Sequence, residues 1–377
     1  WIDTTSNACT ITLPASASNG DEIMFVDYAR NWGTNGIILD SNGLNYQGQD
    51  DEYDVEYGTD GTALHIVYSG ATNGWIPTLD KTVADVPSKG NQEGIFGFGN
   101  AADYTAATNL VSNTGVVSSD VAGVGTARCY LAAGEYGGDK GIFGFGQTSS
   151  KMGMTNLVSN AGVVSSDVAA VGTARGESPA ACGYGGDKGI FGFGHDSNPT
   201  VCDITNLVSN AGVVASDVTG VGTPKLGVAA CSYGEDKGIF GYGLTAVTYT
   251  AVSNLVSNVG VLASNVAGVG TARAHLHACS YGGDKGIFGF GTTGSYVSIT
   301  NLVSNVGVVA SDQAATTGTT RKMLAACEYG GDKGIFGFGT TGSVTAVTNL
   351  VSNTGVVASD TAGVGTARYA LEGCSFN

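Results

Sequence analysis

The chain has 377 residues, of which 61 are Gly and 6 are Pro, and its 16 basic and 32 acidic residues leave a formal charge of −16 at pH 7. A 42% share of apolar residues excludes a disordered chain, and so little Pro excludes collagen. The longest apolar runs are too short to span a membrane. A pI near 4.4 argues against nucleic acid as a partner, because phosphate binding needs a basic surface.

Residues 1–79 are predicted to form a small β-rich module. Short alternating runs such as CTITL, EIMFVDY, GIILD, LNYQG and ALHIVY are separated by Asn-Gly and Asp-Gly turn signals. The region is strongly acidic, since residues 1–93 carry 14 acidic and three basic residues. A module this small buries a modest core, so association with other copies would help to stabilise it.

Two stretches of this module carry a resemblance. The L-P-A-S-x-S-x-G-D stretch at residues 13–21 and the T-N-x-I-x-x-D-x-N-G stretch at residues 34–43 resemble β-rich modules in tail fibres and other appendages of tailed bacteriophages. Such modules are often trimeric. The resemblance therefore implies a homotrimer formed through residues 1–79, within a virion appendage.

A repeat array follows a predicted linker at residues 80–93 and occupies residues 94–377. GIFGFG or GIFGYG begins at Gly94, Gly141, Gly189, Gly238, Gly286 and Gly334, with starts 47 to 49 residues apart. This period lies in the range of four-stranded propeller blades. Each repeat continues with Asn-Leu-Val-Ser-Asn, a segment like VAGVGTAR, and an apolar run that ends in Gly-Gly-Asp-Lys or a variant of it.

Each repeat predicts four short strands without helices between them. In the second repeat they cover residues 131–136, 141–146, 156–159 and 163–166. The two-residue period of a strand places Phe143 and Phe145 on one face and Ile142, Gly144 and Gly146 on the other. We expect the Phe pair of one sheet to pack against the glycine-lined face of its neighbour.

The two ends of the array complement each other. The first repeat begins at strand 2, at Gly94, whereas the last repeat ends in ARYALEGCSF, which matches strand 1. The sequence therefore predicts an all-β protein with a six-bladed β-propeller, in which residues 369–375 complete the blade that begins at Gly94. The order of an Arg, an apolar strand, a Gly-Asp-Lys turn, GIFGFG and Asn-Leu-Val-Ser-Asn resembles kelch and RCC1-type repeats, and both families form propellers.

The predicted blades differ at one end only. The 1–2 and 3–4 turns are nearly uniform, while the 2–3 connection differs between repeats, from NAADYTAA to HDSNPTVCDI. Recognition usually occurs on diversified loops of a constant scaffold. The candidate glycan-binding residues are Tyr104, Lys151, His195, Asp196, Asn198, Tyr249 and Tyr296. The linker enters at the uniform end, so these distal loops are expected to point away from residues 1–79; the alternative is ordinary solvated loops.

Two sets of repeated residues are predicted to be structural. Equivalent strand-1 positions hold Cys182, Cys231, Cys279, Cys327 and Cys374. We expect these to be buried, reduced thiols of a chain assembled in a reducing cytoplasm. The second set pairs Asp120 with Arg128, Asp167 with Arg175, Asp217 with Lys225, Asp312 with Arg321 and Asp360 with Arg368, and places Asn265 before Arg273. We expect these pairs to brace loops or cap turns.

Other candidate sites are weaker. His275 and His277 lie two apart on a predicted strand and so would share a face, but two possible ligands do not make a metal site. The acidic residues 50–60 lack the spacing of an EF-hand and are expected to be a solvated strand edge. Nucleotide-binding, esterase, zinc-protease and Cys-x-x-Cys motifs are absent from the sequence. We therefore predict no metal, no cofactor and no enzymatic activity.

Together these observations predict a virion structural protein, a phage fibre or appendage whose distal propeller face binds a host surface glycan or receptor. It would be assembled in the host cytoplasm, lie on the virion surface beside other virion proteins and gain avidity from several weak sites. One alternative is a capsid or tail decoration or packing protein without a host ligand. Another is a glycan-cleaving propeller enzyme, which needs a unique carboxylate pair near the central channel, whereas the pattern of the sequence indicates only repeated acids.

Overall fold

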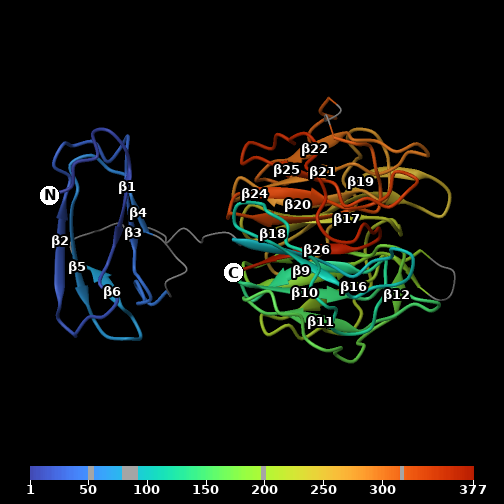
Figure 1. Ribbon diagram of the computed structural model, residues 1–377, viewed down its shortest axis with the longest axis horizontal. Coiled ribbons are helices and arrows are strands. Elements are labelled where there is room, and N and C mark those ends of the chain that lie inside the picture. The colour runs from blue at the N-terminus through green and yellow to red at the C-terminus, as the bar shows by residue number, and fades with distance from the viewer. Residues whose placement is uncertain (50–54, 79–91, 197–200, 315–317) are drawn as a thin grey trace. The chain divides into compact units, whose positions relative to one another are not determined.

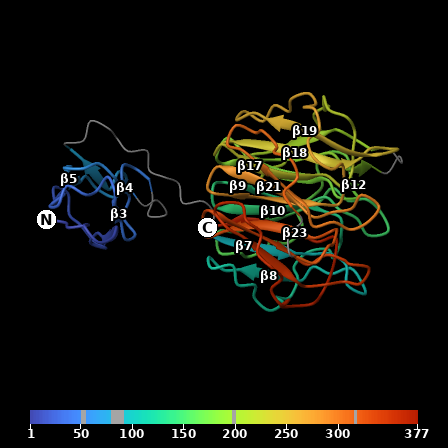
Figure 2. The ribbon, with the colours of Figure 1, turned by 90° about the horizontal axis from the view of Figure 1, so that it is seen from above.

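The structure is a computed structural model that describes residues 1–49, 55–78, 92–196, 201–314 and 318–377. Most of the predicted linker and the start of the acidic run lie outside these residues. The chain divides into two compact units, Trp1–Lys89 and Gly90–Asn377, and both are β-rich (Figures 1 and 2). The described residues contain strands, turns and loops but no helix, and hence no helix that could cross a membrane.

The first unit packs two three-stranded sheets around one core. One sheet has the order β1 (Cys9–Thr12), β3 (Ile37–Asp40), β4 (Val55–Tyr57), and the other β2 (Glu22–Val26), β5 (Ala63–Tyr68), β6 (Trp75–Pro77). Trp32 and Trp75 are buried between them. The prediction of a strand at LNYQG is wrong: this segment forms only isolated bridges at Tyr46, because Gln47 and Gly48 take φ values of 51° and 81° and turn the chain.

The described part of the second unit contains six three-stranded antiparallel sheets, each with a GIFG strand in the middle. In chain order the sheets are β26 (Glu372–Phe376), β7 (Glu93–Gly97), β8 (Thr108–Val111); β9 (Ala132–Tyr136), β10 (Lys140–Gly144), β11 (Thr155–Val158); β13 (Ala180–Tyr184), β14 (Lys188–Gly192), β16 (Thr205–Val208); β17 (Ala229–Tyr233), β18 (Lys237–Leu244), β19 (Tyr249–Val256); β20 (His277–Tyr281), β21 (Lys285–Gly289), β22 (Thr300–Val303); and β23 (Ala325–Tyr329), β24 (Lys333–Gly337), β25 (Thr348–Val351). A further, two-stranded sheet pairs β12 (Arg175–Gly176) with β15 (His195–Asp196).

The predicted fourth strand of each repeat is not formed as a regular strand. Residues 163–166 of the second repeat make only an isolated bridge, Val158 with Val164. Here the Ser165 hydroxyl accepts the Leu157 N–H at 2.9 Å, while the Ser165 N–H donates to the Leu157 carbonyl at 2.8 Å. A side chain thus replaces one backbone acceptor of the ladder in this repeat, whereas the third to sixth repeats hold Ala at this position and also make only the isolated bridge.

The last strand of the chain belongs to the first repeat. β26 pairs antiparallel with β7, with Cys374 opposite Ile95, so the predicted pairing of the C-terminal segment with the strand at Gly94 is confirmed. The first strands β9, β13, β17, β20, β23 and β26 contact one another in this order, and β26 also contacts β9. The first and last repeats are therefore neighbours in space.

Two cycles of backbone hydrogen bonds join the sheets in the same order. At the end with the Gly-Asp-Lys turns, N–H groups donate from Gly137 to Asp187, Gly185 to Asp236, Gly234 to Asp284, Gly282 to Asp332, Gly330 to Gln92 and Asn377 to Asp139. At the other end, just before strand 1, they donate from Tyr130 to Ala370, Ala370 to Met323, Met323 to His275, His275 to Gly227, Gly227 to Glu177 and Ser178 to Tyr130. Gln92 takes part in the first cycle, so the chain enters the second unit at the end with the uniform turns.

Glycine makes room for phenylalanine between successive sheets, as predicted. A Cβ atom on Gly144 would lie 2.7 Å from the Phe191 ring, and one on Gly337 would lie 3.1 Å from the Phe96 ring. The second contact joins the sixth repeat to the first. The same packing therefore occurs between the two ends of the array as between neighbours in sequence.

The prediction that Phe143 and Phe145 share a face is wrong. Phe145 follows β10 with a φ of 62°, which interrupts the alternation of side chains. Phe143 stacks edge-to-face on Phe98 of the preceding repeat with centroids 5.2 Å apart, and Phe145 on Phe191 of the following repeat at 5.1 Å. The two rings of one repeat therefore stabilise two different sheet interfaces.

Candidate functional site

The 2–3 connections lie beside the segments that lead into the first strands. Backbone bridges join Asn100 to Tyr369, Cys129 to Gln147, Gly176 to His195, Leu226 to Leu244, Ala274 to Thr292 and Lys322 to Thr340. We call the 2–3 connections, together with the residues that precede each first strand, the variable end. The Gly-Asp-Lys and Ser-Asn-x-Gly turns form the turn end, where a Cβ on Gly137 would lie 3.2 Å from the Asn210 carbonyl oxygen of the next repeat.

The predicted binding residues that the structure describes belong to five of these connections. Tyr104 is 41% exposed. Lys151 is half-buried, and its Nζ donates to Gln147 Oε1 at 2.9 Å and to Glu177 Oε1 at 3.0 Å. Tyr296 is also half-buried, and the Nζ of Lys322 lies 5.5 Å from its ring centroid.

The other predicted residues lie closer to the sheets than expected for free loops. His195 and Asp196 form β15 and pair with β12, and the Nδ1 of His195 is buried without a hydrogen-bond partner. Tyr249 begins β19 opposite Leu244. Asn198 lies outside the described residues. The predicted residues that the structure describes are thus distributed over five connections of the variable end.

Sequence reasoning missed the residues between these connections, in the second hydrogen-bond cycle. Equivalent positions hold Tyr130, Ser178, Gly227, His275, Met323 and Ala370, with φ values from 51° to 61°. This left-handed conformation favours Gly, yet five of the six positions carry side chains. Because the six residues differ, comparing the repeats with one another at the start of strand 1 could have found them.

Aromatic, thioether and imidazole groups meet at this cycle. The Tyr130 hydroxyl donates to the Met323 sulfur at 3.5 Å, and the Tyr130 ring lies edge-on to that of Tyr369 with centroids 6.3 Å apart. Burial raises the pKa of Tyr130. Burial, with a smaller effect of Lys322, lowers the pKa of His275 to about 4, so its imidazole is neutral at pH 7. Its Nδ1 is buried without a hydrogen-bond partner.

The prediction that His275 and His277 share a strand face is wrong. β20 begins at His277, and His275 precedes it with a φ of 53°. The Nε2 of His277 lies 2.6 Å from Glu372 Oε2. Burial alone would lower the pKa of His277, but the Glu372 carboxylate raises it above its ordinary value. His277 is therefore paired, and no group of three or more His, Cys, Asp or Glu residues suited to a metal ion occurs in the described part of the chain.

The six first strands line one cavity, which we call the axial cavity. The space that the centre of a water molecule can reach is about 30 Å³, room for roughly two waters. Its polar side chains are Glu135, Ser232, His277, Ser280 and Glu328. The two glutamates occupy a strand-1 position that holds Ser or Gly in the other repeats. The sequence prediction considered only repeated acids and so missed them.

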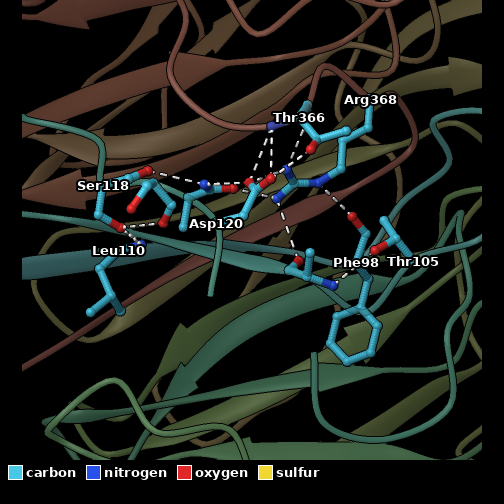
Figure 3. A network of polar contacts seen from close by, with 10 residues as sticks. Phe98, Thr105, Leu110, Ser118, Asp120, Thr366 and Arg368 are labelled. Atoms are coloured by element: carbon cyan, nitrogen blue, oxygen red, sulfur yellow. Dashed lines mark hydrogen bonds and ion pairs between the residues drawn. The ribbon is translucent and has the colours of Figure 1, made fainter. Parts of the chain in front are cut away.

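The repeated acids do not pair with the cations that follow them by eight or nine residues, so the predicted pairing is wrong. Asp120 accepts hydrogen bonds from the Thr366 N–H at 3.0 and 3.1 Å, the Thr366 hydroxyl at 2.6 Å and Asn109 Nδ2 at 2.8 Å. Its Oδ1 lies 3.8 Å from Nη1 of Arg368 (Figure 3), whereas Nη1 of Arg128 lies 4.0 Å from Oδ1 of Asp167. The loop that carries each acid bonds the segment before strand 1 of its own sheet, which a spacing of eight residues cannot reveal.

The same bond from a Thr N–H recurs around the unit. The remaining acceptors and donors are Asp167 with Thr126, Asp217 with Thr173, Asn265 with Thr223, Asp312 with Thr271 and Asp360 with Thr319. Turn capping is therefore their main role, as expected. In the repeat with Asn265 in place of Asp, the buried cation is Lys225, and burial lowers its pKa to about 7.

The predicted cysteine positions are confirmed as structural. All cysteines are free, and the five of strand 1 are buried. Burial raises the pKa of Cys231 to about 12, so it stays a thiol at neutral pH. Neither nucleophilic nor metal chemistry is supported at these sulfurs.

No known protein family matches the sequence, and a search of curated proteins gives no match. The two ends of the second unit therefore have to be interpreted from their own residues.

Proposed function

We propose that residues 92–377 form a closed six-bladed β-propeller whose variable end binds a host surface glycan or glycoprotein, as the distal part of a virion appendage. One observation carries this proposal. Successive sheets make the same contacts in cyclic order, including those between the sixth repeat and the first, while the residues at one end differ from repeat to repeat. Diversity confined to one end of a constant scaffold is typical of a binding surface.

The chemistry of the variable end suits a saccharide. Tyr104, Tyr130 and Tyr369 supply aromatic faces for the C–H side of a sugar ring, and Lys151 with Glu177 supplies donors and acceptors. The chain enters the second unit at the turn end, through Gln92. The linker therefore enters the unit away from the proposed binding surface.

The virion location and the homotrimer depend on the resemblance of residues 13–43 to phage appendage modules. In that setting several weak sites on one stalk would raise the effective concentration of each. The acids of the axial cavity support a glycan-cleaving activity poorly, because space for about two waters does not admit a sugar ring.

A second candidate, a packing protein without a host ligand, is favoured by a different observation. After each Ser-Asn-x-Gly turn an exposed valine recurs, at Val116, Val163, Val213, Val261, Val308 and Val356, with 62% to 66% exposure. Six equivalent apolar residues suit contacts with repeated copies of a capsid or tail protein.

Binding of the full chain to arrays of bacterial surface polysaccharides and to whole bacterial cells tests the proposal. Replacing Tyr130 and Tyr369 with Ala should weaken binding about tenfold or more, which corresponds to about 1.4 kcal/mol. The matched control, Val116→Ala with Val163→Ala at the turn end, should bind as the parent does. Binding to neither arrays nor cells, or loss in the valine variant alone, would favour the packing role instead.

A further inference from the structure

Two carboxylates face the axial cavity without a cationic partner. Glu135 comes from β9 and Glu328 from β23, and no Lys or Arg lines the cavity. The imidazole of His277 is paired with Glu372. Glu328 is 7% exposed, and its carboxylate has no hydrogen bond with any described residue. Burial raises the pKa of both glutamates, and for Glu328 the nearby Glu135 adds to this effect.

The fold does not need acids at these positions. In other repeats the same strand-1 position holds a small residue that bonds the neighbouring strand: the Ser232 hydroxyl accepts from the Gly183 N–H at 3.1 Å, and the Ser280 hydroxyl donates to the Ser232 carbonyl at 3.3 Å. An unpaired buried carboxylate costs several kcal/mol unless it is neutralised. Glu328 is such a group, and the partly exposed Glu135 adds a second carboxyl group at the same cavity, which indicates a ligand that supplies positive charge.

Both acids flank the C-terminal strand. β26 contacts β23 on one side and β9 on the other, and its Ser375 lies between the two glutamates. The Ser375 hydroxyl accepts the Glu328 N–H at 2.7 Å, and Glu135 is hydrogen-bonded to Ser375. A group bound by both Glu135 and Glu328 would therefore link the two neighbours of β26, the strand that joins the last repeat to the first.

We propose that Glu135 and Glu328 bind one divalent cation, best Ca²⁺, in the axial cavity. Carboxylates, the hydroxyls of Ser232 and Ser280, and water are oxygen ligands of the kind that Ca²⁺ prefers. The charge of Ca²⁺ balances the combined charge of the two carboxylates. Ca²⁺ tolerates irregular coordination by six to eight oxygens, whereas Mg²⁺ demands a near-octahedral set. With two carboxylates, an affinity of about 0.1–1 mM is expected, as in weak calcium modules.

Thermal unfolding of the full chain tests the site without involving host binding. Against EDTA, 10 mM CaCl₂ should raise the Tm of the second unit by about 5 °C, and MgCl₂ or NaCl of equal ionic strength should do much less. Glu328→Gln and Glu135→Gln should each abolish the shift. The control Glu235→Gln, at an exposed glutamate of the turn end, should retain it.

Titration calorimetry of the unmodified chain gives a second readout that needs no variant to fold, with one Ca²⁺ bound per chain as the expected result. The proposal is overturned if calcium does not bind or if all salts shift the Tm equally. It is also overturned if Glu328→Gln is as stable as the parent in calcium, because the two carboxyls would then be neutral by protonation. Glycan binding can fail while the calcium shift persists, so this proposal and the proposed function are tested separately.

Discussion

Equivalent positions hold the same residues where the sheets pack together, but they hold different residues in the axial cavity. Within and between the sheets the same Phe, Gly, Arg and Asp contacts recur with three conservative changes, Lys225, Asn265 and Tyr242. In the axial cavity and at its variable end, equivalent positions hold different residues, among them Glu135, Glu328 and Tyr130. Repetition thus marks the residues that hold the sheets together, and departures from it mark the candidate functional residues.

The largest effect is expected where a repeated contact is blocked. Gly144→Val should destabilise the second unit by about 3 kcal/mol, because even its Cβ would lie 2.7 Å from the Phe191 ring. In an unpacked strand the same change would stabilise, since Val favours β structure more than Gly does. Urea unfolding measures the difference. Gly138→Ala, where a Cβ meets nothing within 4 Å, should cost only about 1 kcal/mol from its positive φ.

A smaller loss is expected at a repeated cap. Asp167→Ala removes bonds from the Thr126 N–H and hydroxyl and from Asn156, and should cost about 2 kcal/mol at pH 7. Burial raises the pKa of Asp167, but these hydrogen bonds lower it by more, so the pKa lies below its ordinary value. Its stabilisation is therefore complete above about pH 4 and is lost as pH falls through the folded-state pKa.

Urea unfolding of the parent and Asp167→Ala at pH 7 and pH 3 checks both parts of this prediction. The difference between the two proteins should shrink at the lower pH. A difference independent of pH would show that the carboxylate charge is irrelevant, and the exposed Asp103→Ala serves as the control.

The replacement of the repeated Arg and Asp by Lys225 and Asn265 should give a change of about 1 kcal/mol. Burial lowers the pKa of Lys225 to about 7. Between about pH 7 and pH 10 the unfolded chain binds this proton and the folded chain does not, so stability should rise with pH over that range. Asn265→Asp places a carboxylate near Lys225, as in the other repeats, and should raise stability at pH 7 and flatten the rise. Unfolding free energies at pH 7, 8.5 and 10 test this, and an unchanged slope would contradict it.

The smallest effect on stability is expected at the variable end. Tyr104 is 41% exposed, so Tyr104→Ala should change the unfolding free energy by less than about 0.5 kcal/mol. Under the proposed function it should still weaken glycan binding. A large loss of stability would mean that this connection is part of the packed scaffold.

Much of the fold could be predicted because six repeats carry the same strand and turn patterns. The GIFG strands, the uniform turns and the match between the two ends of the repeat array follow from the repeat period and the turn residues. Features that depend on the conformation of a single residue or on a neighbour in the tertiary structure could not be predicted from the sequence. The φ of 62° at Phe145 turns its ring toward a different sheet interface, and Asp120 bonds a segment 246 residues away.

The candidate sites were predictable only in part. Differences in loop length and composition identified the connections at the variable end. Glu135 and Glu328 were overlooked because each is a single substitution within an otherwise repeated strand, and only the proximity of β9, β26 and β23 brings the two together. A comparison of the repeats that searches for exceptions would have found them.

Amide hydrogen exchange of the full chain tests most directly whether the last repeat is bonded to the first. The amides of β26 and β7 pair with each other in the same way as those of β17 and β18, so they should be protected to the same degree. If the array were open, both terminal strands would fray. Exchange of the Glu372–Phe376 amides orders of magnitude faster than that of Ala229–Tyr233 would contradict the account.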